Sequence, residues 1–206
     1  MLENVIVFGQ NAIKFDMDKK IYIDPFKLNE NYNDADVIFI THDHFDHFSK
    51  EDISKVIKDD TVLVVPTCMK DIVNDYQNVV LVDIGEYEVL GIKFSTVPAY
   101  NINKDFHPKE KAYVGYILSL NNHKYYVAGD TDNVPEIRNV DCDVAFLPIG
   151  GTFTMDYEEA YGLVTSINPK VVVPVHYGAV VGSSEDGIKF MELVNQTDID
   201  CFLLIK

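Results

Sequence analysis

The chain has 206 residues, enough for one sizeable hydrophobic core, and 47% of them are hydrophobic, an ordinary share for a globular protein. Its formal net charge of −16 repels nucleic acid and anionic lipid at long range, and Arg138 is the only arginine. No apolar run approaches the length of a membrane span. Met1-Leu2-Glu3-Asn4 lacks the basic residues of a secretion signal, so we expect no such signal. These features count against a dedicated nucleic-acid reader and against a membrane protein. We expect a single cytoplasmic domain over residues 1–206.

The first part of the chain predicts short strands, identified by their apolar and β-branched residues, at residues 4–8, 12–15, 20–23 and 37–40. Ser49 and Asp52 then resemble a capping box, which predicts a helix over residues 50–57. A strand over residues 61–65 precedes Pro66, which suits the first turn of a short helix through about residue 74.

The second part of the chain predicts strands at residues 79–82, 86–90, 92–97, 113–120, 125–128, 143–147, 171–175 and 200–205. Helices are expected over residues 157–167, where Asp156 is the cap, and over residues 185–195. Residues 101–111 read as a polar loop. This order predicts an α/β (α+β) fold in which two mixed sheets pack face to face with helices outside.

Three cysteines, Cys68, Cys142 and Cys201, are far apart and lack any C-x-x-C spacing. We expect reduced, mostly buried thiols. Asp141 and Asp143 flank Cys142 and should raise its pKa, which opposes thiolate chemistry.

The strongest functional signal is a histidine run directly after the apolar residues 37–40, with the sequence Thr41-His42-Asp43-His44-Phe45-Asp46-His47. Neutral imidazole suits zinc, iron and nickel, and a carboxylate adds an oxygen ligand. His42 and His44 are two residues apart, so they point the same way from an extended segment. Asp46 and His47 follow where the chain turns and can serve a second, adjacent metal. The run therefore predicts a metal centre.

Two further residues of the kinds that bind metal ions, an aspartate and a histidine, follow apolar strands. Asp130 comes after the strand at residues 125–128 and Gly129, as either a metal ligand or the cap of a helix near Asn133. His176 ends the strand at residues 171–175, where a histidine is either a ligand or a satisfied core residue. Because this strand-then-ligand pattern occurs three times, we favour the ligand interpretation.

Several other residues carry two interpretations each. His107 is a ligand or a surface histidine, and Asp24 orients a ligand imidazole or only forms a turn. Gly150 and Gly151 offer backbone N–H groups to an oxyanion or allow a tight turn.

Together, the histidine run, Gly129-Asp130-Thr131 and the segment from Pro174 to Tyr177 resemble the metallo-β-lactamase superfamily of metal-dependent hydrolases. The segments Asp24-Pro25-Phe26 and Leu147-Pro148-Ile149-Gly150-Gly151 are similar to the branch with ascorbate-6-phosphate lactonase and the UPF0173-like hydrolases. The resemblance implies a four-layer αββα sandwich with metals at the edge between the sheets.

The resemblance also implies a ligand set. His42 and His44 would bind the first metal, Asp46, His47 and His176 the second, and Asp130 would bridge them. The family supplies a third histidine to the first metal from a position near Tyr100-Asn101 of this chain. His107 is the only histidine nearby, so we assign it that role.

The implied cofactors are two divalent metal ions, zinc first, with manganese, iron or nickel as alternatives. The implied reaction is hydrolysis of a small ester, lactone or phosphodiester by a metal-bridged hydroxide, with Asp46 and Asp130 as catalytic carboxylates and Tyr177 as a donor to substrate or a packing residue. Alternatives are a metal-dependent nuclease or RNA-processing phosphodiesterase, a di-iron redox protein, or a non-catalytic metal-binding relative. The expected partner is a small-molecule substrate, with no membrane or nucleic acid, and homo-oligomer formation is left open.

Overall fold

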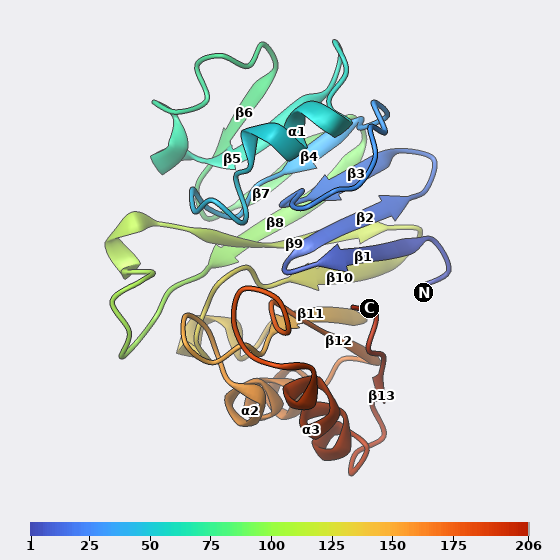
Figure 1. Ribbon diagram of the computed structural model, residues 1–206, viewed down its shortest axis with the longest axis vertical. Coiled ribbons are helices and arrows are strands. Elements are labelled where there is room, and N and C mark those ends of the chain that lie inside the picture. Colours follow the sequence, from blue (N-terminus) through green and yellow to red (C-terminus); the bar gives the residue numbers. More distant parts are fainter. Residues whose placement is uncertain (206) are drawn as a thin grey trace.

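A computed structural model describes residues 1–205, which form two β-sheets packed face to face (Figure 1). The first sheet contains, in spatial order, β1 (Val5–Gly9), β2 (Ala12–Asp16), β3 (Lys20–Ile23), β4 (Val37–Phe39), β5 (Val62–Pro66) and β6 (Val79–Val82). The spatial order of the second sheet is β13 (Asp200–Cys201), β12 (Val171–Val175), β11 (Val144–Pro148), β10 (His123–Val127), β9 (Val114–Leu120), β8 (Ile92–Pro98) and β7 (Glu86–Val89).

Each sheet begins with antiparallel pairs and continues with parallel pairs. The strands β1 to β3 pair antiparallel and β3 to β6 pair parallel. In the second sheet β7 to β10 pair antiparallel and β10 to β13 pair parallel. The parallel strands of one sheet end at one edge, which is where α/β proteins place their ligands.

Aromatic side chains from both sheets form the central core. The Phe39 ring of β4 lies 5.0 Å from both the Phe94 ring of β8 and the Tyr116 ring of β9, in edge-to-face geometry. The Phe15 ring of β2 lies 6.0 Å from the Phe146 ring of β11. These contacts bury the inner faces of the two sheets against each other.

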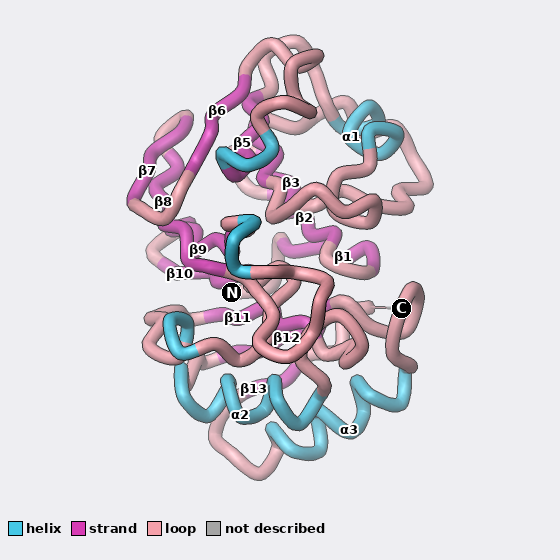
Figure 2. Tube along the Cα trace, turned by 90° about the vertical axis from the view of Figure 1, so that its left-hand side faces the viewer, coloured by secondary structure: helices cyan, strands magenta, loops and turns pink. Residues whose placement is uncertain are grey.

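Helices cover the outer faces of the sheets (Figure 2). The helix α1 (Lys50–Val56) buries Ile53 and Val56 against the first sheet. On the second sheet, α2 (Tyr157–Ile167) and α3 (Ser184–Val194) bury Leu163 and Phe190. The predicted four-layer αββα sandwich is confirmed. Within residues 1–205, no helix is both long and apolar enough to cross a membrane.

The helix caps follow the local sequence. The Ser49 hydroxyl accepts the Asp52 N–H at 3.2 Å and begins α1. Asp156 begins α2 in a full capping box with Glu159. Both helices lie within one residue of their predicted bounds.

Two predicted elements are wrong. After Pro66 only a 3₁₀ turn forms at Thr67–Met69, because residues 70–78 are mostly polar and offer too few apolar side chains to hold a helix against the sheet. The closing strand covers only Asp200–Cys201 instead of residues 200–205. The Phe202 N–H still donates to the Val172 carbonyl, but Pro174 lacks the N–H that would continue this ladder.

The three cysteines are free thiols. Cys142 is buried and Cys201 is half-buried, but Cys68 is exposed, in contrast to the expected burial. Burial, reinforced by Asp141 and Asp143, raises the pKa of Cys142 to about 12, as the sequence predicted.

Candidate metal centre

The histidine run leaves β4 as an extended segment and then turns. The N–H groups of His47 and Phe48 both donate to the His44 carbonyl, at 3.0 and 2.8 Å. His42 and His47 are fully buried, and His44 is half-buried. The rings of His42 and His44 lie 4.6 Å apart, on the same side of the chain. The turn carries Asp46 and His47 to the adjacent position.

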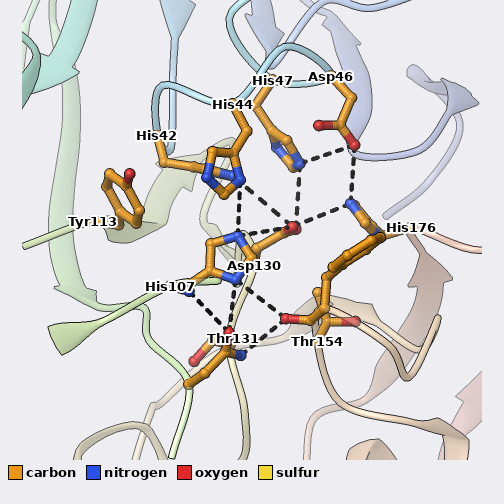
Figure 3. Close-up of polar contacts among 12 residues, drawn as sticks. His42, His44, Asp46, His47, His107, Tyr113, Asp130, Thr131, Thr154 and His176 are labelled. Carbon is orange, nitrogen blue, oxygen red and sulfur yellow. Dashed lines mark hydrogen bonds and ion pairs between the residues drawn. The ribbon is translucent and has the colours of Figure 1, made fainter. Parts of the chain in front are cut away.

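Asp130 lies in the middle of the centre (Figure 3). Its Oδ2 is 3.2 Å from His176 Nε2, 3.4 Å from His107 Nε2 and 3.9 Å from His42 Nε2. Its Oδ1 is 3.3 Å from His47 Nε2. Four imidazoles from three different loops therefore surround one carboxylate. Asp130 does not cap a helix, since the next helical turn begins only at Pro135.

The ligand-type atoms fall into three groups in which all atoms lie within 4.8 Å of one another. One group holds His42, His44 and His107, and another holds Asp46, His47 and His176. The third, His42, His47 and Asp130, joins the other two. All seven residues predicted as ligands are thus brought together, including His107, which is 1% exposed and not a surface histidine.

Four buried atoms of this cluster lack a hydrogen-bond partner, namely His42 Nε2, His47 Nε2, Asp130 Oδ1 and His176 Nδ1. A buried polar atom without a partner destabilises a fold by about 1–3 kcal/mol. The first three atoms belong to the group of His42, His47 and Asp130, and a divalent cation would satisfy them. His176 instead faces Asp46 and Asp130 through its other nitrogen, Nε2. The residues therefore fit a metal whose ligands are imidazole nitrogen and carboxylate oxygen.

The carboxylates of the centre are ionised at neutral pH. Burial alone would raise the pKa of Asp46, but the adjacent His176 and His47 and the Gln10 amide lower it to about 2. Burial is likewise outweighed at Asp130, where His176 and His47 hold the pKa well below its usual range. Both residues are thus available as anionic ligands.

Four of the imidazoles form two pairs that differ in the direction of their pKa shift. Burial lowers the pKa of His42 well below its ordinary value and that of His107 to about 4, so both are neutral. Burial also opposes charge on His47 and His176, but Asp130 outweighs it, assisted by Asp24 at His47 and by Asp46 at His176. The pKa of His47 is well above its ordinary value and that of His176 is about 9.

Asp24, which directly follows β3, contacts the imidazole of His47, a candidate metal ligand. Its Oδ2 lies 2.7 Å from His47 Nδ1 and accepts hydrogen bonds from Thr41 Oγ1 at 2.6 Å and Asn11 Nδ2 at 2.7 Å. The Thr41 N–H donates to its Oδ1 at 2.8 Å. Because Asp24 holds Nδ1, the other ring nitrogen of His47, Nε2, faces the centre. Asp24 therefore orients this imidazole, as the first of the two interpretations from the sequence expected.

Gln10 belongs to the centre and was missed by the sequence analysis. Its Nε2 donates to Asp46 Oδ2 at 2.9 Å and lies 3.2 Å from His176 Nε2. Its backbone carbonyl accepts the backbone N–H of His176 at 2.8 Å. Asn101 and Tyr113 were also missed. The Tyr113 hydroxyl donates to Asp43 at 2.5 Å, and its ring lies 5.1 Å from His42. No local pattern marks these residues.

Three residues of the centre adopt the left-handed backbone region that non-glycine residues seldom occupy. The φ angles are 46° at Gln10, 41° at Asp24 and 55° at His176. Such strain persists only where surrounding contacts impose it, and it gathers at functional sites.

Of the paired glycines, Gly151 has its N–H engaged within the loop, and Gly150 packs tightly against the His176 loop. The Gly151 N–H donates to the Met155 carbonyl at 3.0 Å, so it is already used. A Cβ on Gly150 would lie 2.4 Å from the His176 carbonyl oxygen. Gly150 therefore allows the His176 loop to approach β11 closely, which supports the tight-turn interpretation.

Tyr177 packs in the core under α3. It is 4% exposed, and a Cβ on Gly187 of α3 would lie 2.6 Å from its ring. The structure therefore places it as a packing residue and not as a donor to substrate.

An αββα sandwich with a histidine and aspartate cluster at the strand ends defines the class of metallo-hydrolases with the metallo-β-lactamase fold. The model of the beta-lactamase superfamily domain matches residues 5–176. A UPF0173 metal-dependent hydrolase of Pyrococcus abyssi is 33% identical over 205 residues, which cover 90% of this chain and 89% of the relative.

Solved structures of other proteins have the same fold as this chain. A protein from Parabacteroides distasonis, to which metal-dependent hydrolase activity has been ascribed, superposes with a TM-score of 0.86 at 27% identity, covering 98% of this chain and 93% of that one. The metallo hydrolase Igni18 from Ignicoccus hospitalis shares the fold, with a TM-score of 0.80 at 22% identity and coverage of 98% and 94%. The chain belongs to the beta-lactamase superfamily and is a hydrolase of its UPF0173-like branch.

Proposed function

We propose that the chain binds two divalent metal ions and hydrolyses a small ester, lactone or phosphodiester. His42, His44 and His107 would hold the first ion, and Asp46, His47 and His176 the second. The observation that carries this proposal is the position of Asp130, whose two oxygens lie 3.2 to 3.9 Å from ligand nitrogens of both groups. A carboxylate in this place is suited to bridge two ions.

When bound, two such ions lower the pKa of a shared water toward neutrality and supply hydroxide as a nucleophile. The chain's own residues position the reactants. Asp46 is ionised, so its carboxylate accepts a hydrogen bond from the attacking water and orients it. The Gln10 amide holds Asp46 through its 2.9 Å hydrogen bond. Asp24 holds the His47 ring in turn.

The ligand chemistry favours zinc. Three imidazoles in the first group are typical of zinc, whereas manganese prefers oxygen-rich sites. Iron and nickel also accept imidazole ligands. Elemental analysis of gently purified protein would identify the ion and give its number per chain.

The surface supports an uncharged or small substrate over a nucleic-acid polymer. The net charge is −16, and the guanidinium of Arg138 is engaged with Asn133 at 2.8 and 2.9 Å. Phe45 and Phe106, each adjacent in the chain to a proposed ligand, are 68% and 47% exposed. Apolar side chains next to the ligands do not favour a phosphate backbone. We expect the reaction to take place in the cytoplasm, where the free cysteines would stay reduced.

Two substitutions test the proposal. We expect His42→Ala and Asp130→Ala to abolish turnover, since each removes a ligand from the linked groups, while circular dichroism shows a folded chain. Turnover would be followed on p-nitrophenyl acetate, a small lactone and bis-p-nitrophenyl phosphate. His123→Ala, on the half-exposed start of β10, is the matched control and should retain full activity. Undiminished turnover in both ligand variants would contradict the proposal.

A further inference from the structure

His107 reaches the centre on a loop closed by backbone hydrogen bonds. The Asn101 N–H donates to the His107 carbonyl at 2.8 Å, which closes the loop segment 101–107. The Asp132 N–H donates to the Tyr100 carbonyl at 2.9 Å, which ties this loop to the one that carries Asp130. The loop thus has a fixed base, although it protrudes from the sandwich (Figure 1).

The Asn101 side chain makes four hydrogen bonds at this base. Its Oδ1 accepts the His107 N–H at 3.1 Å and lies 2.9 Å from His107 Nδ1. Its Nδ2 donates to Asp132 Oδ1 at 3.1 Å and to the Phe153 carbonyl at 2.9 Å. The side chain is buried, and every part of the amide has a partner.

These partners determine which nitrogen of His107 carries the proton. A backbone N–H can only donate, so the amide must direct Oδ1 toward His107 and Nδ2 toward Asp132. His107 Nδ1 then faces two acceptors, Asn101 Oδ1 at 2.9 Å and the Phe153 carbonyl at 3.2 Å, and must itself donate. In the neutral ring, Nε2 consequently keeps its lone pair. That atom lies 3.2 Å from His44 Nδ1 and 3.4 Å from Asp130 Oδ2.

Asp132 fixes the amide from the opposite side. Besides Asn101, it accepts the Ile102 N–H at 2.8 Å and the Lys104 ammonium at 2.6 Å. Lys104 also lies 3.5 Å from Glu159 of α2. A chain of contacts therefore runs from α2 through Lys104, Asp132 and Asn101 to the imidazole of His107.

We propose that Asn101 is a positioning residue for the first metal: its amide fixes the Nδ1–H tautomer and the ring orientation of His107, and so presents Nε2 as a ligand. The inference rests on the proposed function, because it assumes that His107 binds metal. It gives a role to the position where the family resemblance leads us to expect a histidine. Here the amide at residue 101 directs a histidine six residues further on.

The test is a metal titration of metal-free protein with Co²⁺, followed by calorimetry and by the visible absorption of bound cobalt. We expect Asn101→Ala to lower the affinity for one of the two Co²⁺ ions about 10- to 100-fold and to change the visible absorption spectrum of that ion. The other ion should bind as in the wild type. If the cavity left by alanine impairs folding, Asn101→Leu replaces it, because leucine nearly keeps the side-chain volume. We expect Asn101→Leu to have the same effect on metal binding. Asn133→Ala, which removes another hydrogen-bonded loop amide, is the control and should bind both ions normally.

Introducing Asn101→Ala into a His107→Ala variant distinguishes a role of Asn101 in positioning His107 from a general role in the structure of the loop. If Asn101 acts through His107, Asn101→Ala should weaken metal binding no further in that background. An additional loss there, or an unchanged affinity in Asn101→Ala while His107→Ala loses an ion, would overturn the inference and leave the proposed function intact. If His107→Ala binds both ions like the wild type, the proposed ligand set itself fails.

Discussion

At the scale of single residues, Asp24 is the buried carboxylate on which the orientation of His47 depends. It is completely buried, and Asn11, Thr41 and His47 direct their polar hydrogens toward its two oxygens. Asparagine has one acceptor oxygen and would place its NH₂ group against these donors. We expect Asp24→Asn to lower the free energy of unfolding of the metal-free protein by about 3 kcal/mol, a value typical of breaking a buried ion pair. Urea titration would measure this change.

The same substitution should also weaken metal binding about 10- to 100-fold, because His47 would lose the acceptor that fixes its ring. Asp18→Asn makes the same chemical change at an exposed residue, and it should alter neither the free energy of unfolding nor the metal affinity. If Asp24→Asn were as stable as Asp18→Asn and bound metal equally well, Asp24 would have no orienting role.

At the scale of elements, the sequence predicted those strands and site residues that a local pattern marks. The apolar runs at β4, β10 and β12 predicted strands, and the ligand-type residues that follow these runs lie together in the candidate metal centre. Gln10 could not be predicted, since its contacts reach Asp46 and His176, 36 and 166 residues away. The same holds for Asn101, whose role depends on Asp132 and Phe153. Tertiary contacts of this kind leave no periodicity in the sequence.

Close packing between two elements explains Gly150. A Cβ there would meet both the His176 carbonyl oxygen at 2.4 Å and a Val181 methyl at 2.5 Å, so the His176 loop would have to move away from β11. We expect Gly150→Ala to destabilise the protein by about 1–3 kcal/mol through overpacking. It should also weaken binding of the metal ion that we propose His176 to hold.

A matched control exists at Gly85, where a Cβ would lie at an ordinary 3.5 Å from the Tyr87 ring. Gly85→Ala should therefore be close to wild type in urea unfolding and in metal titration. Equal stability of the two variants would show that the His176 loop can shift freely, contrary to the close packing that we describe.

At the scale of the whole molecule, the centre couples folding to pH, because His42, His47, His107 and His176 titrate differently from the histidines of an unfolded chain. An ordinary histidine has a pKa near 6.5. His42 and His107 lie below this value in the fold, His107 at about 4, so the unfolded chain binds more protons between about pH 4 and 6.5. His47 and His176 lie above it, His176 at about 9, so the folded chain binds more protons between about pH 6.5 and 9.

Stability rises with pH wherever the unfolded state binds more protons, and falls where the folded state does. We therefore expect the free energy of unfolding of the metal-free protein to increase from about pH 4 to 6.5 and to decrease from there to about pH 9. Metal binding requires neutral imidazoles, so metal affinity should instead rise with pH across the second window. Urea unfolding of chelator-treated protein at pH 5, 6.5 and 9 measures the first effect, and calorimetric metal titrations from pH 6.5 to 8 measure the second. In His176→Gln the alkaline decrease should be smaller, since one of the two proton-binding groups is gone. If the metal-free protein became steadily more stable up to pH 9, the carboxylates around Asp130 would not hold protons on His47 and His176 as the structure indicates.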